Sequence, residues 1–166
     1  MKKLLLFFIF IYLIGCSDAR NQNTKVLNIE CPRVFFSLEN NLFIDGAKES
    51  TDLEEINYKA TLNNYGFVKN CFNDSEKYNY NLDLLIIIDP INPKDEKINL
   101  PLFVLFYNME GKLLDSQYFR VENKLIYNNS LSEYETTNVI KNLNIYLKAN
   151  QKVSSMTIGF VKIKNK

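Results

Sequence analysis

The sequence predicts an all-β protein built as a single antiparallel β-sandwich domain. Hydrophobic residues recur at every second position in several segments, which is the period of a strand with one face on a core. The roughly 150 residues that follow the N-terminal segment suit one domain. The strand-like segments do not alternate with long helical ones, so a parallel sheet with crossover helices is not expected.

The N-terminal segment has the pattern of a secretion signal. Lys2 and Lys3 precede an uncharged apolar run, and a polar sequence follows it directly. A helix that crosses a bilayer needs about 20 apolar residues. The run over residues 4–15 holds only twelve. We therefore expect residues 1–15 to be a signal peptide that is removed on secretion.

The end of this segment reads Leu13-Ile14-Gly15-Cys16 and resembles the lipobox of bacterial lipoproteins. The resemblance implies cleavage before Cys16, a diacylglyceryl thioether on its sulfur and an acyl chain on its new amino group. Several acyl chains anchor a protein firmly to a lipid bilayer, whereas a single myristoyl chain binds only marginally. Ser17 stands where an Asp would mark inner-membrane retention, so the resemblance implies an outer-membrane protein of the bacterial cell envelope that faces the periplasm.

A short tether is expected between the lipid and the folded domain. Residues 16–25 comprise the lipidated Cys16 and a polar stretch that is short of apolar side chains. An extended chain covers about 3.3–3.6 Å per residue, so nine residues reach about 30 Å. We place the sandwich domain at residues 26–166.

The first strands are predicted where apolar and polar residues alternate. Three segments carry this pattern: Val34, Phe36 and Leu38; Tyr58, Ala60 and Leu62; and Tyr78, Tyr80, Leu82, Leu84, Ile86 and Ile88. The third is the clearest, because its partners Asn79, Asn81 and Asp83 are polar. Asp89-Pro90 is expected to end that strand, since proline cannot donate a ladder hydrogen bond.

The second half of the chain predicts a hairpin and two more strands. Residues 102–107 are apolar on both faces, which is typical of a central strand. Asn108-Met109-Glu110-Gly111 follows and indicates a hairpin with a bulge, because a glycine closes a short loop between two apolar runs. Residues 113–121 form the return strand. Two further alternating sets are Leu143, Ile145 and Leu147, and then Met156, Ile158 and Phe160.

One or two short helical turns are expected between the strands. Ser132-Glu133-Tyr134-Glu135 fits a capping box, although the β-branched residues over positions 136–140 argue against a long helix. A second turn is expected around residues 50–56. About seven strands at regular spacing favour an immunoglobulin-like or fibronectin-like sandwich, with a small closed β-barrel as the alternative.

The cysteine count predicts a disulfide. Assigning Cys16 to lipid leaves Cys31 and Cys71, an even remainder in an oxidising compartment. A bridge would close a loop of about 40 residues and stabilise the fold by roughly 4 kcal/mol in the chain-entropy estimate. Two buried free thiols are the alternative.

Charge and residue types exclude several functions. Lys2 and Lys3 are two of the 20 basic side chains, so the mature part carries 18 against 19 acidic ones and lacks the basic surplus of a nucleic-acid binder. The sequence contains no histidine and no glycine-rich phosphate loop, so we expect no histidine-based nucleophile, no metal and no cofactor.

Carboxylates offer the remaining route to catalysis or to a cation site. Asp83 and Asp89 lie at even spacing on one predicted strand, and paired carboxylates can act as acid and base. Nothing in the sequence places a substrate between them. Asp45, Glu49 and Asp52 surround Gly46, but their spacing does not match a calcium loop. We expect a protein that is not an enzyme.

Tyrosines give the most direct hypothesis for binding. The chain has ten Tyr and twelve Phe, and Tyr is enriched at interfaces because it combines apolar area with a hydroxyl. Tyr78, Tyr80, Tyr118 and Tyr127 are the candidates for a patch that contacts a partner. Core packing is the alternative explanation for the same residues.

Three further stretches are similar to small proteobacterial envelope lipoproteins of unknown function. They are Cys31-Pro32-Arg33-Val34, residues 65–71 and Leu100-Pro101-Leu102-Phe103-Val104. This resemblance implies no activity. The sequence as a whole favours a non-enzymatic envelope lipoprotein that binds another envelope protein or polymer. A carboxylate-dependent hydrolase of an envelope polymer and a small-ligand carrier are the alternatives.

Overall fold

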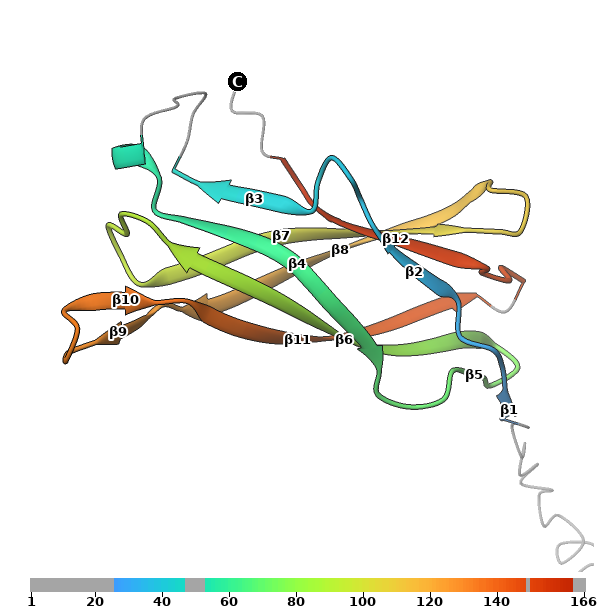
Figure 1. Ribbon diagram of the computed structural model, residues 1–166. Coiled ribbons are helices and arrows are strands. Elements are labelled where there is room, and N and C mark those ends of the chain that lie inside the picture. The colour runs from blue at the N-terminus through green and yellow to red at the C-terminus, as the bar shows by residue number, and fades with distance from the viewer. Residues whose placement is uncertain (1–25, 47–52, 149, 163–166) are drawn as a thin grey trace, which may run out of the picture.

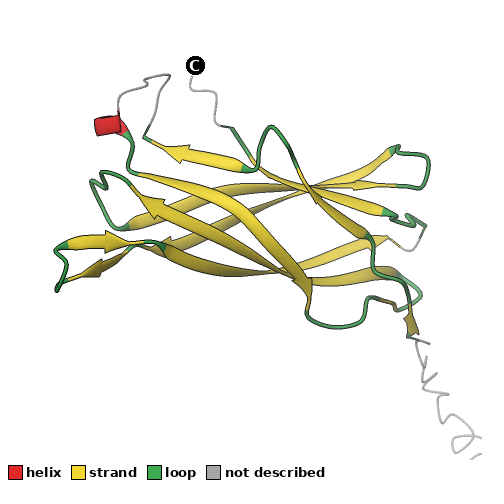
Figure 2. Cartoon of the chain, in the orientation of Figure 1, coloured by secondary structure: helices red, strands yellow, loops and turns green. Residues whose placement is uncertain are grey.

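The computed structural model describes residues 26–46, 53–148 and 150–162, and these residues fold as an all-β domain. Two largely antiparallel sheets lie face to face as a sandwich (Figure 1). Helix in the described part of the chain is limited to one short 3-10 turn, η1 (Leu53–Glu55) (Figure 2). The predicted signal peptide, Cys16 and the tether lie outside the described residues.

Sheet A has six strands and is organised around its longest one. Its strands are β1 (Leu27–Asn28), β3 (Leu42–Asp45), β4 (Tyr58–Phe67), β5 (Phe72–Asn73), β6 (Lys77–Pro90) and β11 (Thr137–Lys148). β6 pairs with β11 along one side and with β4 and β5 along the other. β3 extends the sheet beyond β4, and β1 extends it beyond β5.

Sheet B has four strands in the order β2 (Arg33–Phe36), β12 (Ser155–Phe160), β7 (Lys97–Tyr107) and β8 (Leu113–Lys124). β12 runs parallel to β2 and antiparallel to β7. A separate hairpin of β9 (Ile126–Asn128) and β10 (Glu133–Glu135) leads from β8 in sheet B to β11 in sheet A. In the described residues the sheets form a sandwich and no closed barrel, which excludes the barrel alternative.

The hydrophobic core lies between the sheets, because each long strand buries every second side chain. In β6 the fully buried residues are Leu82, Leu84, Ile86 and Ile88. Facing strands and β11 contribute Leu100, Leu102, Val104, Phe106, Leu143, Ile145, Met156, Ile158 and Phe160. The two-residue period therefore identified the core correctly. β7 lies between β12 and β8, so its predicted central position is also confirmed.

The number of strands is larger than the sequence suggested, because several strands are only two to four residues long. Twelve strands are present in the described part of the chain, against the seven or so expected. Such short segments carry too few alternating positions to be recognised by period. The expected sandwich is confirmed at the level of architecture, as two packed and largely antiparallel sheets.

The predicted helical turn at Ser132 is wrong. Residues 133–135 form β10, and Tyr134 pairs with Tyr127 of β9. Ser132 has a φ of 55° and closes the turn of this hairpin, so it does not cap a helix. The β-branched residues that follow favour the extended conformation. The other expected turn is confirmed in part by η1, while residues 47–52 lie outside the described residues.

The predicted hairpin between β7 and β8 is confirmed. The register shifts between Phe106 and Tyr107, which is the expected bulge. Gly111 has a φ of 74°, a left-handed conformation that glycine adopts without steric cost. The side-chain oxygen of Asn108 accepts hydrogen bonds from the backbone N–H groups of Glu110 and Lys112, at 3.0 and 2.8 Å. β6 ends at Pro90, as its sequence indicated.

The predicted disulfide between Cys31 and Cys71 is present, and it fastens the first described segment to sheet A. The two Cα atoms are 5.2 Å apart. Beside the bridge, the N–H of Ile29 donates to the carbonyl of Cys71 at 2.9 Å, and β1 pairs with β5. The chain therefore enters the sandwich at the end where β5 lies, and a covalent bond holds it there (Figure 1).

Candidate ligand-binding site

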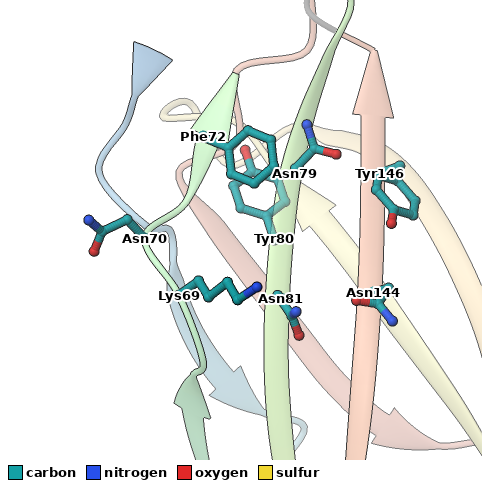
Figure 3. Close-up of a pocket in the computed structure, with 8 residues that line it drawn as sticks. All are labelled: Lys69, Asn70, Phe72, Asn79, Tyr80, Asn81, Asn144 and Tyr146. Carbon is teal, nitrogen blue, oxygen red and sulfur yellow. The ribbon is translucent and has the colours of Figure 1, made fainter. Parts of the chain in front are cut away.

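A shallow pocket of about 180 Å³ opens on the outer face of sheet A, at the end where the chain enters the sandwich. Figure 3 shows its lining, which comes from the β4–β5 connection and from β5, β6 and β11. The lining residues are Lys69, Asn70, Phe72, Asn79, Tyr80, Asn81, Asn144 and Tyr146. Sites that enclose a drug-sized ligand measure about 300–1,000 Å³. This pocket therefore suits one unit of a larger ligand.

The register of β6 and β11 brings the outward side chains of the pocket together. Asn81 lies opposite Asn144, and Asn79 lies opposite Tyr146. Paired residues on neighbouring strands have their Cβ atoms about 4.5–5.5 Å apart. Each pair can therefore contact the same ligand group.

Asn79 is held firmly at the back of the pocket. It is only 6% exposed, and its amide nitrogen donates to a carboxylate oxygen of Asp74 and to the carbonyl of Lys77, both at 3.2 Å. Asp74 in turn accepts from the backbone N–H of Lys77 at 2.9 Å. Desolvation raises the pKa of Asp74, but hydrogen bonds from Lys77, Asn79 and Glu76 outweigh it and lower the pKa below its ordinary value. The ionised carboxylate thus orients the amide.

A second set of hydrogen bonds orients the amides further along the strands. The amide nitrogen of Asn142 donates to the side-chain oxygen of Asn81 at 2.6 Å and to Asp83 at 2.9 Å. The side chains of Asn70 and Asn144 make no hydrogen bond to any other described residue. Asn144 lies opposite Asn81 on the ladder, so its donors and acceptor are open to the pocket, whereas Figure 3 shows the amide of Asn70 directed away from the other lining side chains.

Tyr146 presents an aromatic surface beside the amides. Its side chain is 54% exposed, and the ammonium of Lys77 lies 4.8 Å from the centre of its ring. Its backbone carbonyl accepts from the side chain of Gln117 at 3.0 Å, which ties β11 to β8 of the other sheet. The ring therefore stands on a strand that is fixed at this point.

The four tyrosines proposed from the sequence do not form one patch. Tyr78 and Tyr80 stack at 6.3 Å between ring centres, but Tyr80 is 2% exposed and its ring lies behind β6 in Figure 3. Burial raises the pKa of Tyr80, as expected for a hydroxyl in the core. Tyr118 is 69% exposed on the outer face of sheet B. Tyr127 packs edge-on against Tyr134 in the β9–β10 hairpin.

The pocket residues were missed because their proximity depends on long-range pairing. Asn79 and Asn81 were recognised only as the polar partners of a strand. Asn144 and Tyr146 lie about 65 positions further along the chain, and only the β6–β11 register brings them together. The available signal was the polar phase of two amphipathic strands, 79–83 and 142–146.

The carboxylates considered for catalysis are not a pair. Asp83 and Asp89 both point to the outer face of β6, but six residues of strand separate them by about 20 Å. Glycosidase carboxylates lie about 5–9.5 Å apart. Asp83 accepts from Asn142, and Asp89 accepts from the hydroxyl of Thr136 at 3.0 Å. These contacts give both carboxylates a structural role.

The acidic cluster around Gly46 is described only in part. Asp45 accepts from the amide of Asn57 at 2.7 Å, and Gly46 has a φ of 95°. Glu49 and Asp52 lie outside the described residues. Within the described ranges, no group of three or more Cys, Asp or Glu side chains is arranged to hold a metal ion.

Comparison with models of protein families, with curated proteins and with solved structures gives no match for this chain. The resemblances carried by Leu13-Ile14-Gly15-Cys16 and by the three internal stretches therefore stay predictions. Among the residues that the structure describes, no helix is long and apolar enough to span a membrane.

Proposed function

We propose that this chain is a lipid-anchored protein of the bacterial cell envelope that binds another envelope component without catalysing a reaction. The anchor is acylated Cys16, and the domain faces the periplasm from the outer membrane. The binding site is the pocket on the outer face of sheet A.

The observation that carries this proposal is the position of the pocket at the end of the sandwich where the described chain begins. Lys69, Asn70 and Phe72 line the pocket at the start of β5, and β5 pairs with β1, near which the described chain begins. About ten residues separate Cys16 from Val26, and extended they would span about 35 Å. A lipid on Cys16 would keep Val26 within about that distance of the bilayer, and the pocket opens at the same end of the domain.

The chemistry of the pocket favours binding over catalysis. Its lining contains amides, aromatic rings and one ammonium group, but no carboxylate. The sequence has no histidine to act as a general base. The pocket is too small to enclose a whole small-molecule ligand, so its volume favours contact with one part of a large molecule.

The lipid anchor is tested by the mass and the membrane partition of the mature protein. We expect an intact mass above that of residues 16–166 by a diacylglycerol and one acyl chain, and recovery in the membrane fraction. Cys16→Ser should abolish both. A Cys16→Ser variant that is processed normally and stays in the membrane would refute the anchor.

The binding site is tested by photo-crosslinking in intact cells. A photoreactive benzoylphenylalanine replaces Tyr146 in one strain and Tyr118 in a matched control, because both rings are exposed but lie on different sheets. We expect a discrete adduct only at position 146, and its loss when Cys16→Ala is added. Equal adducts at both positions, or none at position 146, would contradict the proposed site.

A further inference from the structure

The amides of the pocket match a ligand that is rich in hydroxyl groups. Four of the lining residues are asparagines: Asn70, Asn79, Asn81 and Asn144. A carboxamide offers two donors and an acceptor on a short planar group. A sugar hydroxyl also donates and accepts, so neighbouring hydroxyls on one ring can pair with neighbouring amides.

Two of these amides are already oriented before a ligand arrives. Hydrogen bonds from Asn79 to Asp74 and Lys77, and from Asn142 to Asn81, fix their positions. Fixing a side chain in advance lowers the entropy lost on binding. Asn144, whose amide makes no hydrogen bond to another described residue, provides the adaptable contact, whereas Figure 3 shows the amide of Asn70 directed away from the other lining side chains.

The exposed ring of Tyr146 supplies the apolar element of the same site. A sugar ring has a face of C–H groups and a rim of hydroxyls. An aromatic ring buries that face, and the amides of Asn81 and Asn144 lie on the adjacent pair of the ladder, where they can reach the rim. The hydroxyl of Tyr146 is not needed for this packing.

The row of polar side chains on the outer face of the β6–β11 ladder, which we call the binding strip, continues beyond the pocket and could contact a polymer. Asn142 and Asp83 form the next pair along the ladder, so amides or carboxylates occupy three successive pairs with Tyr146 at one end. Successive pairs on one face of a sheet lie about 6.8 Å apart. A linear chain of linked rings could follow these positions.

The one charged side chain in the pocket lining is positive, which favours an acidic sugar in the pocket itself, while Asp83 at the next pair favours a neutral unit there. Lys69 is the only positively charged side chain in the lining, and Figure 3 shows its ammonium directed toward Asn81. Protein-binding surfaces are rich in aromatic, Met and Arg side chains around an apolar centre. The pocket shares the aromatic rings of such surfaces but has no Met or Arg, and half of its lining residues are asparagine.

From these observations we propose that the pocket binds a sugar unit of an envelope glycan. Tyr146 packs on the sugar ring, the asparagines pair with its hydroxyls, and Lys69 pairs with a carboxylate on the sugar. This inference rests on the proposed binding function and specifies the ligand of the same site.

Calorimetric titration tests this inference with full-length lipidated protein in mild detergent. The probes are tri-galacturonic acid, maltotriose and tri-N-acetylchitotriose. We expect the acidic trisaccharide to bind most tightly, and Lys69→Gln to remove that preference. Tyr146→Ala should weaken its binding about tenfold, which is about 1.4 kcal/mol. Tyr146→Phe should retain the affinity within about twofold, since the ring face is kept, and Tyr118→Ala should change nothing.

The outcomes distinguish failure of the proposed sugar ligand from failure of the proposed binding function. Absence of binding by all three trisaccharides, or binding unchanged in Tyr146→Ala, overturns the sugar site. Equal affinity for acidic and neutral probes overturns the role of Lys69. A protease-sensitive adduct from position 146 in cells, together with no trisaccharide binding, would overturn the glycan ligand and leave the binding function standing.

Discussion

The outer face of the β6–β11 ladder has two halves of different chemistry on the same two strands. The half near β5 carries Asn79, Asn81, Asp83, Asn142, Asn144 and Tyr146, and we call it the amide half. The half toward the β9–β10 hairpin carries the aliphatic Leu85, Ile87 and Ile140 together with Asn138, and we call it the aliphatic half. Ile140 is 70% exposed.

The inner faces of the two halves do not differ in this way. Leu82, Leu84, Ile86 and Ile88 are all fully buried, and the register between the two strands runs without a shift. The fold therefore sets the inner face and leaves the outer face free to vary. The change from amides to aliphatic side chains lies on the outer face, which does not pack in the core, so we infer that it reflects what that face contacts.

Removal of the disulfide should have the largest effect and should separate the two halves. Replacing both Cys31 and Cys71 by Ala is expected to lower the free energy of unfolding by about 4 kcal/mol. Because residues 69–72 lose their covalent partner, hydrogen exchange should rise more at backbone amides 78–82 than at 85–88. Urea unfolding and exchange mass spectrometry measure these two effects. An equal rise in both halves would contradict the local role of the bridge.

A cavity in the core beneath the boundary between the amide half and the aliphatic half should destabilise both halves. Ile86 is fully buried, and Ile86→Ala is expected to lower the free energy of unfolding by about 3 kcal/mol. Glycan affinity should persist at temperatures where the variant is folded. Urea titration gives the change in stability, and a loss below about 1 kcal/mol would show that the core is looser here than its burial indicates.

Asn79 links stability to binding, so its replacement should act on the amide half alone. Asn79→Ala removes the hydrogen bonds to Asp74 and Lys77 and should lower the free energy of unfolding by about 1–2 kcal/mol. Trisaccharide binding should weaken as well. The matched control is Asn138→Ala, an exposed position in the other half of β11. Equal effects of the two substitutions would argue against a special role for Asn79.

Acidification should weaken the amide half through Asp74. The pKa of Asp74 is lower in the folded protein than its ordinary value of 3.8, so the unfolded chain binds the proton more readily. The contribution of Asp74 is then present above that value and is lost as the pH falls through the folded pKa. Between about pH 5 and about pH 3 the wild type should lose more stability than Asp74→Asn in parallel thermal melts. Identical slopes would be inconsistent with the lowered pKa.

The smallest effect is expected from the aliphatic half. Ile140→Asn replaces an exposed side chain and should change the free energy of unfolding by less than about 0.5 kcal/mol. Trisaccharide affinity should remain that of the wild type. A loss of affinity would extend the binding strip across the boundary and remove the distinction between the halves.

The parts of the fold that follow from local pattern were predictable from the sequence. The alternation over residues 78–88 placed β6 and its buried face, and the even remainder of cysteines placed the disulfide. The same alternation predicts that Tyr80 is buried, because Tyr80 is in phase with Leu82 and Leu84. Treating Tyr80 as a surface residue ignored that phase.

The candidate site depended on information that the sequence does not hold locally. Asn144 and Tyr146 meet Asn81 and Asn79 through one choice of register, and a shift by one residue would turn every outward side chain inward. The helical turn predicted at Ser132 was wrong for a related reason. The capping-box pattern is local, whereas pairing with β9 is decided by the neighbouring strand.

The bond between Cys31 and Cys71 has a mechanical consequence for a domain tethered by its N-terminus. A pull on the tether reaches the sandwich through β1, whose pairing with β5 spans only two residues and would peel apart at low force. The covalent bridge then passes part of the tension to Cys71, and from there to the long ladder of β4 with β6. β2 follows Cys31 along the chain, so an oxidised bridge lowers the tension that reaches sheet B.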